Sequence, residues 1–198
     1  GEKVTEESVI TDNITLFAHW KHDTFIFNEN STLLYDAQTK TVYGLSASVT
    51  EDGSLPVISS HGACMLADTR AASCLGQQYD LVYLPGGMPG TANLALSQDV
   101  KNLVNKELEN QGVVAAICAA PIALDAAGVL DGVKYTCYPG CEKQISNGEY
   151  TGARIQISGA IITGCGPGVA AEMAFELLRA LGLADKAASI AASMQMKF

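Results

Sequence analysis

The stretch that decides the fold is residues 112–121, which read GVVAAICAAP. The apolar run through Ile117 is rich in β-branched residues and has the length of a buried strand. Helix-forming residues 122–127 follow at once, and Gly128 suits the position just after a helix. The pattern predicts a strand that turns directly into a helix, with Cys118 at the turn.

The predicted position of Cys118 gives its thiol a reason to ionise. A strand-to-helix turn lies at the carboxyl edge of a sheet and at the amino end of a helix, where N–H groups have no partner within the helix. The positive end of the helix dipole also lies there and favours a thiolate. This is the layout of a nucleophile elbow, with sulfur in place of a serine hydroxyl. Most cysteines are small buried hydrophobic side chains, but the elbow position leads us to predict a reactive nucleophile.

The composition predicts one domain over residues 1–198. The chain is 48% hydrophobic and 17% charged, which is enough apolar material for a sizeable core without disulfides. No uncharged segment reaches membrane-spanning length, and the acidic residues 1–7 do not have the pattern of a signal peptide. The net charge of −9 argues against binding to nucleic acids or to an anionic membrane. The six cysteines are too widely spaced for a compact disulfide framework, so we expect mostly reduced thiols and a cytoplasmic location.

Predicted strands and helices alternate along the chain from about residue 41. We also expect a sharp loop at Pro85-Gly86-Gly87 and a helix that is capped by Ser97. Because the strands are nearly continuous in apolar residues, they fit a mostly parallel sheet that is covered on both faces. The predicted strands span 41–49, 56–60, 81–84, 112–117, 133–136, 155–158 and 160–163, with a hairpin at Gly159, and the two terminal helices span 169–181 and 184–196.

Three motifs together resemble the ThiJ/PfpI superfamily and, within it, the protein-deglycase branch. Leu84-Pro85-Gly86-Gly87 precedes the cysteine motif of residues 115–121, and Gly166-Pro167-Gly168 follows it, in the order and spacing of that family. The resemblance covers residues 41–198 and leaves 1–40 as an atypical N-terminal segment. It implies a flavodoxin-like three-layer α/β/α sandwich, a homodimer and a cysteine that is easily oxidised to the sulfinic acid. The activities it implies are cofactor-free conversion of methylglyoxal to lactate, repair of glycated groups, chaperoning and redox sensing.

The predicted chemistry begins when the Cys118 thiolate attacks an aldehyde carbon and forms a hemithioacetal. The oxygen of this adduct develops negative charge, and the backbone N–H groups of Gly87 and Ala119 are the candidates that hold it. Gly86 and Gly87 lack a side chain, so the main chain can approach the reacting atoms closely. An acid or base must then move a proton between neighbouring carbons of a dicarbonyl. We expect no metal and no organic cofactor.

The proton-transferring carboxylate has two alternative placements. Family members place a glutamate beside the cysteine sulfur, in a segment that opens the first helix. In one register, Glu6-Glu7-Ser8-Val9-Ile10 resembles that segment and Glu7 is the partner of the sulfur. In the other, 14–18 is the first strand and 28–38 the first helix, and Phe25 or Ile26 falls where the glutamate is expected. Glu7 is also compatible with an ordinary solvated charge, and without a carboxylate near the sulfur we expect weak turnover or none.

Other positions limit the predicted activity. Ala119 stands where peptidase-like relatives have a histidine, so we expect no peptidase activity. Tyr138, followed by Pro139, occupies the place of a pocket histidine in some relatives, and its phenol can donate a hydrogen bond. His61 stands where relatives often have an arginine, and it is either an anion-binding pocket residue or an ordinary loop histidine.

Two classes of function remain open. The first, which we favour, is a cofactor-independent enzyme that acts on small reactive carbonyls through Cys118. The second is a non-catalytic redox sensor or chaperone-like dimer, in which oxidation of the same cysteine changes the surface or the stability of the protein. The expected partners are a small carbonyl substrate and a second copy of the chain.

Overall fold

A mostly parallel sheet carries the cysteine turn. The computed structural model describes residues 34–35, 41–42, 45–47, 56–58 and 64–196. Its central sheet has the order β11-β12-β8-β7, and the strands are β7 (Leu81–Leu84), β8 (Val113–Ile117), β11 (Ile155–Ser158) and β12 (Ile161–Gly164). Strands β7, β8 and β12 are parallel, whereas β11 pairs antiparallel with β12. The predicted parallel sheet and the hairpin at Gly159 are therefore confirmed.

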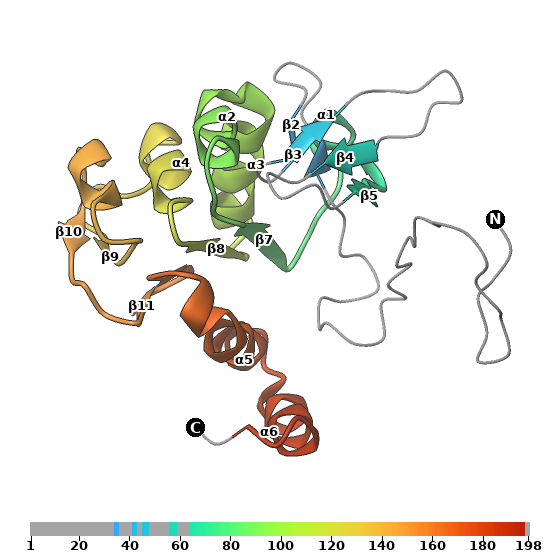
Figure 1. Ribbon diagram of the computed structural model, residues 1–198, viewed down its shortest axis with the longest axis vertical. Helices are drawn as coiled ribbons and strands as arrows, with labels where there is room; N and C mark the ends of the chain where they lie inside the picture. The colour runs from blue at the N-terminus through green and yellow to red at the C-terminus, as the bar shows by residue number, and fades with distance from the viewer. Residues whose placement is uncertain (1–33, 36–40, 43–44, 48–55, 59–63, 197–198) are drawn as a thin grey trace, which may run out of the picture.

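Strand β8 is buried on both faces, as its continuous apolar sequence predicts. Val114 and Ala116 belong to one hydrophobic cluster, while Ala115 and Ile117 belong to a second cluster with Met173. Figure 1 shows helices α2, α3 and α4 on one side of β7 and β8, and α5 and α6 on the other. The predicted three-layer arrangement is confirmed.

The helices lie close to their predicted positions. Their bounds are α1 (Ala71–Cys74), α2 (Gly90–Leu96), α3 (Gln98–Glu109), α4 (Pro121–Ala126), α5 (Ala170–Ala180) and α6 (Ala184–Ser193), with short 3₁₀ turns η1 (Cys141–Gln144) and η2 (Pro167–Val169). The hydroxyl of Ser97 accepts a hydrogen bond from the Val100 N–H at 3.2 Å, so the predicted cap of α3 is confirmed. Gly128 follows α4 with a φ of 78°, a left-handed conformation that suits glycine.

One predicted strand is in fact two. Strands β2 (Thr41–Val42) and β3 (Leu45–Ala47) pair antiparallel, so the chain reverses direction between them and the single strand predicted over 41–49 is wrong. A glycine at position 44 interrupts that run, and glycine inside an apparent strand often marks such a break. The same antiparallel sheet continues through β4 (Pro56–Ile58) to β5 (Cys64–Leu66).

The second alternative for the N-terminal segment is wrong where it can be compared. Strand β1 (Leu34–Tyr35) lies inside the helix proposed over 28–38 and pairs parallel with β6 (Thr69–Arg70). Pairing with a strand from a distant part of the chain satisfies the backbone groups of these two residues, and local propensity does not foresee such pairing. The strand expected over 14–18 lies outside the described residues.

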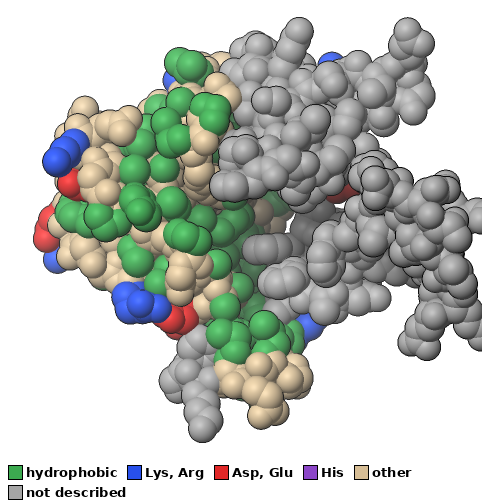
Figure 2. Space-filling view, in the orientation of Figure 1, with side chains coloured by type: hydrophobic (Ala, Val, Ile, Leu, Met, Phe, Trp, Pro, Cys, Tyr) green, Lys and Arg blue, Asp and Glu red, His purple; other side chains and the backbone are tan. Residues whose placement is uncertain are grey.

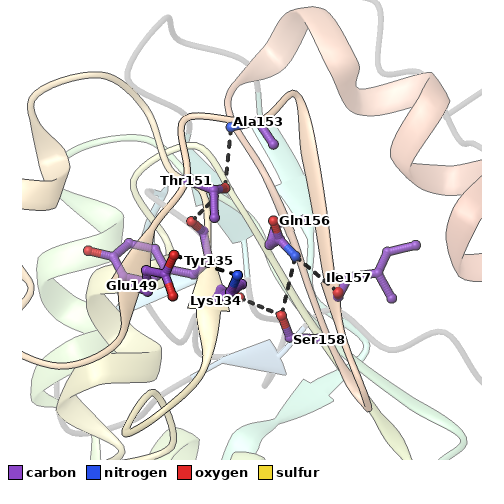
Figure 3. Close-up of polar contacts among 8 residues, drawn as sticks. All are labelled: Lys134, Tyr135, Glu149, Thr151, Ala153, Gln156, Ile157 and Ser158. Atoms are coloured by element: carbon purple, nitrogen blue, oxygen red, sulfur yellow. Dashed lines mark hydrogen bonds and ion pairs between the residues drawn. The ribbon is translucent and has the colours of Figure 1, made fainter.

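A polar network fastens the short parallel strands β9 (Lys134–Tyr135) and β10 (Glu149–Tyr150) to strand β11, as Figure 3 shows. The hydroxyl of Ser158 donates to the Lys134 C=O at 2.7 Å, and that of Thr151 donates to the Tyr135 C=O at 3.1 Å. The ion pair between Lys134 and Glu149, at 3.6 Å, is exposed and adds little. The network fixes where the chain leaves β9, and residues 136–141 then run past the cysteine turn.

Some large hydrophobic side chains stay on the surface. Figure 2 shows hydrophobic groups over much of the described surface in that view, with scattered charged groups. The exposed large hydrophobic residues are Met88, Leu96, Tyr138, Tyr150, Ile157, Leu183 and Met194. Among the described residues, none of the helices has both the length and the apolar character that a membrane span needs.

Candidate active site

Cys118 lies at the turn between β8 and α4. Its N–H donates a hydrogen bond to the Gly164 C=O at 2.8 Å, which completes the last pair of the β8–β12 ladder, between Ile117 and Gly164. The φ of Cys118 is 62°, in the left-handed region that non-glycine residues seldom adopt. Backbone strain of this kind persists only where the surroundings enforce it, and it clusters at functional sites. The side chain itself is partly exposed, so the thiol is within reach of small molecules.

The loop after β7 approaches the cysteine turn so closely that it requires glycine at position 86. A Cβ on Gly86 would lie 2.5 Å from the Cys118 Cβ and 2.6 Å from the Ile117 carbonyl oxygen. No side chain fits there unless the turn itself moves. Gly87 is exposed, has a φ of 98°, and accepts a hydrogen bond from the Thr91 N–H at 2.9 Å. The two glycines bring main chain, not side chains, against the nucleophile.

The N–H of Ala119 is a donor beside this contact. Its nitrogen lies 3.2 Å from the position that a Cβ on Gly86 would take. The neighbouring N–H groups are already used, since that of Cys118 binds Gly164 and that of Ala120 binds the Ile117 C=O at 3.0 Å. Within residues 64–196, no hydrogen bond from the Ala119 N–H is formed. An unpaired N–H at a strand-to-helix turn is suited to hold a developing negative charge.

Residues 136–141 pass along the cysteine turn. The Tyr138 N–H donates to the Cys118 C=O at 2.8 Å, so the backbone of this segment is fixed to the turn. The Tyr138 side chain is 50% exposed. Its ring would lie 3.4 Å from a Cβ on Gly166, so the glycine leaves room for it. Pro139 is exposed in the turn that follows.

Two threonines outside the predicted site hold this segment in place. The Thr136 N–H donates to the Thr163 hydroxyl oxygen at 2.9 Å, and the Thr136 hydroxyl donates to the Ala153 C=O at 2.6 Å. Both threonines are fully buried. The signal that points to them is their place at the ends of two predicted strands, 133–136 and 160–163, where the other residues are mostly apolar. A buried hydroxyl there needs a partner.

The charge of a Cys118 thiolate acts on three other titratable groups. Burial, followed by the charge of Cys118, raises the pKa of Tyr83 to about 12. Burial also raises the pKa of Cys137 to about 12, with further contributions from Cys141, Glu142 and Cys118. The pKa of Cys141 is raised first by burial and then by the charges of Cys118 and Glu142. The thiols of Cys137 and Cys141 are therefore poor nucleophiles near neutral pH.

Tyr83 was not among the predicted site residues. It is the third residue of β7 and pairs with Ala115 on β8, and its side chain packs against the cluster that also contacts Cys118. A phenol in an otherwise aliphatic strand that ends at the glycine loop is the signal that identifies it in the sequence.

Two predicted site residues, Glu7 and His61, lie outside the described residues, so their roles stay predictions. Among the described side chains, no carboxylate forms a hydrogen bond with the Cys118 sulfur. The same part of the chain contains no group of three or more side chains that could hold a metal ion. The described cysteines 74, 118, 137, 141 and 165 are free thiols.

Known proteins resemble this arrangement in sequence and in fold. Residues 29–180 match the DJ-1/PfpI family. The chain is 35% identical over 161 residues to the Parkinson disease protein 7 homolog of Danio rerio, and the match covers 79% of this chain and 82% of that protein. It is 29% identical over 137 residues to the glutathione-independent glyoxalase DJR-1.2 of Caenorhabditis elegans, with 68% and 73% covered. The crystal structure of Drosophila melanogaster DJ-1beta superposes with a TM-score of 0.69 at 32% identity, over 72% of this chain and 78% of that one.

Proposed function

We propose, because this chain belongs to the DJ-1/PfpI family, that it is a cofactor-independent cysteine enzyme that converts small reactive carbonyls such as methylglyoxal into hydroxy acids such as lactate. The observation that carries the proposal is the strained, partly exposed Cys118 at the β8–α4 turn, with the main chain of Gly86 held against it. The similarity to a protein named a glutathione-independent glyoxalase supports the same chemistry.

The proposed reaction starts with a carbon–sulfur bond. The Cys118 thiolate adds to the aldehyde carbon, and the electron pair of the C=O moves to oxygen, where the N–H groups of Ala119 and Gly87 hold it. After the oxygen is protonated, a proton leaves the former aldehyde carbon and the neighbouring carbonyl oxygen gains a proton, which gives an enediol. A proton is then delivered to the neighbouring carbon, and the hydroxyl on the sulfur-bearing carbon loses its proton as its C=O forms. This isomerisation yields a thioester of the hydroxy acid. Water then cleaves the thioester and releases lactate and the thiol, so no electrons are exchanged with a cofactor.

The proton transfers need a base, which we assign to Glu7. No described carboxylate hydrogen-bonds the sulfur, so the partner would come from the N-terminal segment. A carboxyl group beside the sulfur would donate a hydrogen bond to it when protonated and accept the substrate proton when ionised. The phenol of Tyr138, whose backbone is fixed to Cys118, is suited to donate a hydrogen bond to the substrate, with Pro139 and His61 as further pocket candidates.

We further propose that the protein works as a homodimer in a reducing, cytoplasmic environment. Leu183 and Met194, which directly precede and follow α6, are 42% and 47% exposed, and burial against a second copy would remove them from water. Repair of glycated groups would use the same attack of Cys118 on a carbonyl-derived carbon.

The test is lactate formation from methylglyoxal by the purified protein and by Cys118→Ser. We expect the serine variant to lose at least about 100-fold in turnover, because a serine hydroxyl is far less acidic than a thiol and is a weak nucleophile near neutral pH. Cys141→Ser, which replaces a thiol that is protonated near neutral pH, is the matched control and should keep its turnover. Equal lactate production by the wild type and Cys118→Ser would reject the enzyme.

A redox sensor is the second candidate, and the absence of a described carboxylate partner for the sulfur favours it. In that case Cys118 would react with peroxide while methylglyoxal turnover stays at the background of Cys118→Ser. Mass spectrometry after mild peroxide should then find oxygen added at Cys118 before any other cysteine.

A further inference from the structure

A second cysteine follows the neighbouring strand at the same edge of the sheet. The last paired residues of β8 and β12 are Ile117 and Gly164, and the hydrogen bond from the Cys118 N–H to the Gly164 C=O belongs to that pair. Cys118 and Cys165 are the residues that directly follow this pair on the two parallel strands. Adjacent strands lie about 4.8 Å apart, and a disulfide joins α-carbons separated by about 4.4–6.8 Å. Because both cysteines leave the sheet from one strand pair, they are candidates for a disulfide.

Both thiols can be reached from outside and share one hydrophobic cluster. Cys118 and Cys165 are each partly exposed. Both pack against the cluster that contains Ile117, Val169 and Met173, on the side of the sheet covered by α5. A small hydroperoxide can therefore reach either residue without unfolding of the core.

The other described cysteines are less suited to pair with Cys118. Cys74 is fully buried in a separate cluster with Ala71 and Leu103. Cys137 is fully buried, and burial keeps its thiol protonated with a pKa of about 12. Cys141 packs against the cluster on the opposite face of the sheet, and burial together with the charges of Cys118 and Glu142 raises its pKa.

Cys165 lies beside an arginine, whereas an acidic residue acts on Cys141. The Cys165 N–H donates to the Arg154 C=O at 2.9 Å, so the two residues are neighbours across β11 and β12. The Arg154 guanidinium binds the Glu172 carboxylate through two hydrogen bonds. The pKa of Arg154 is raised first by the hydrogen bonds to Glu172 and by the charge of that carboxylate. The charge of Cys165 raises it further. The charge of Glu142, in contrast, is among the causes that raise the pKa of the Cys141 thiol.

We propose that Cys165 is the resolving thiol of Cys118, so that oxidation of Cys118 by a hydroperoxide ends in a reversible Cys118–Cys165 disulfide. The proposal rests on the proposed reactivity of Cys118. The Cys118 thiolate attacks a peroxide oxygen, the O–O bond breaks, and a sulfenic acid and hydroxide form. The Cys165 thiolate then attacks the Cys118 sulfur, the S–O bond breaks, and hydroxide leaves as the S–S bond forms. In sum, two thiols lose two electrons and hydrogen peroxide is reduced to two waters.

The disulfide protects the nucleophile. A sulfenic acid that finds no thiol is oxidised further to the sulfinic acid, which simple thiols do not reverse. Condensation with Cys165 competes with that step and leaves a bond that dithiothreitol reduces. Oxidation therefore switches the enzyme off reversibly.

The experiment compares the wild type, Cys165→Ser, Cys141→Ser and Cys118→Ser after treatment with equimolar hydrogen peroxide. Free thiols are blocked with N-ethylmaleimide, and digests are analysed by mass spectrometry without reduction. The wild type and Cys141→Ser should give a cross-linked pair of peptides containing Cys118 and Cys165, and dithiothreitol should restore methylglyoxal turnover. In Cys165→Ser the cross-link should be absent, and the yield of Cys118 sulfinic acid should rise by at least about threefold because the competing condensation is lost.

Two results would overturn the assignment of Cys165. One is sulfinic acid at Cys118 at the same rate in the wild type and Cys165→Ser with no disulfide, and the other is a Cys118–Cys141 cross-link. Either result leaves Cys118 reactive, and the proposed enzyme stands. If peroxide and N-ethylmaleimide both fail to modify Cys118 in the folded wild type, the proposed function fails together with the resolving thiol.

Discussion

The two ends of strand β8 have similar backbones and opposite chemistry. Gln111, two residues before the strand, and Cys118, directly after it, have φ values of 63° and 62°, both in the left-handed region. At the carboxyl end the side chain at the strained residue is partly exposed, and the buried polar groups nearby, Thr136 and Thr163, are hydrogen-bonded to each other. Strain alone therefore does not mark a site, because only one of these ends presents a reactive group to solvent.

At the amino end, a carboxyl group is buried instead. Glu107 on α3 is only 3% exposed, and among the described residues its Oε1 has no hydrogen-bond partner. Its carboxyl group packs so closely over Gly112 that a Cβ there would overlap it. Burial, followed by the charge of Asp80, raises the pKa of Glu107 to about 7. The Glu107 Oε1, which has no partner among the described residues, contrasts with the hydrogen-bonded threonines at the carboxyl end of β8.

The largest loss of activity is expected from a side chain at Gly86, where the loop after β7 approaches Cys118 most closely. Gly86→Ala would place a Cβ against both the Cys118 Cβ and the Ile117 carbonyl oxygen. We expect turnover to fall by about 100-fold or more, because small displacements of a nucleophile have that effect. Overpacking should also lower the free energy of unfolding by about 3 kcal/mol. Urea denaturation and the rate of Cys118 alkylation measure the two effects.

Gly168→Ala is the matched control for Gly86→Ala. Gly168 is exposed, and a Cβ on it would meet nothing within 4 Å. If both variants keep wild-type stability and alkylation rate, the close approach of the glycine loop does not define the site.

A pH titration of stability sharpens the contrast at the amino end. The folded-state pKa of Glu107, about 7, lies above its ordinary value of 4.5, so the folded state binds the proton more tightly than the unfolded state. The contribution of the Glu107 proton to the free energy of unfolding is full below pH 4.5 and is lost as the pH rises through 7. A shift of this size corresponds to on the order of 3 kcal/mol. Glu107→Gln should therefore flatten the dependence of the unfolding free energy on pH between 4.5 and about 7.

The exposed Glu109 on the same helix provides the control, since Glu109→Gln should keep the wild-type pH profile. Parallel profiles for the wild type and Glu107→Gln would mean that this carboxyl is not held protonated by the fold.

A smaller effect tests the pairing at the carboxyl end. Thr163→Val keeps the volume but leaves the buried Thr136 N–H without its acceptor. We expect a loss of about 2 kcal/mol in the free energy of unfolding, and a slower Cys118 reaction because residues 136–141 shift. Thr163→Ser keeps the hydroxyl and should recover most of the loss. Chemical denaturation of the three proteins would contradict this interpretation if the serine and valine variants were equally unstable.

Local sequence patterns were sufficient to predict the strand and the helix on either side of Cys118. The apolar run of β8, the helix that begins at Pro121, and the left-handed Gly128 after it all follow from preferences of adjacent residues. The same holds for the Ser97 cap, because a cap and its N–H partner are three residues apart. Prediction was wrong at Leu34–Tyr35, where pairing with the distant strand β6 decides the structure. It was also wrong at 41–49, where two strands pair within six residues on either side of a glycine that the sequence already shows.

Contacts between distant segments could not be predicted. The sequence indicates that Gly86 permits close approach, but only the packed loop shows that its missing Cβ would meet Cys118 and Ile117. Glu107 follows Val100, Leu103 and Val104 at the spacing of the buried face of α3, so its burial was readable in principle. That its Oε1 finds no partner depends on how the chain packs around Gly112.

The sequence by itself determined that a cysteine stands between a buried strand and a helix, because backbone preferences and hydrophobic periodicity act over a few residues. Only the tertiary structure decided which groups surround it: the main chain of Gly86, the Tyr138 segment fixed by buried threonines, and Cys165 on the neighbouring strand. These contacts join residues more than 15 positions apart, and they form only when burial of both faces of β8 brings the loops to one edge of the sheet.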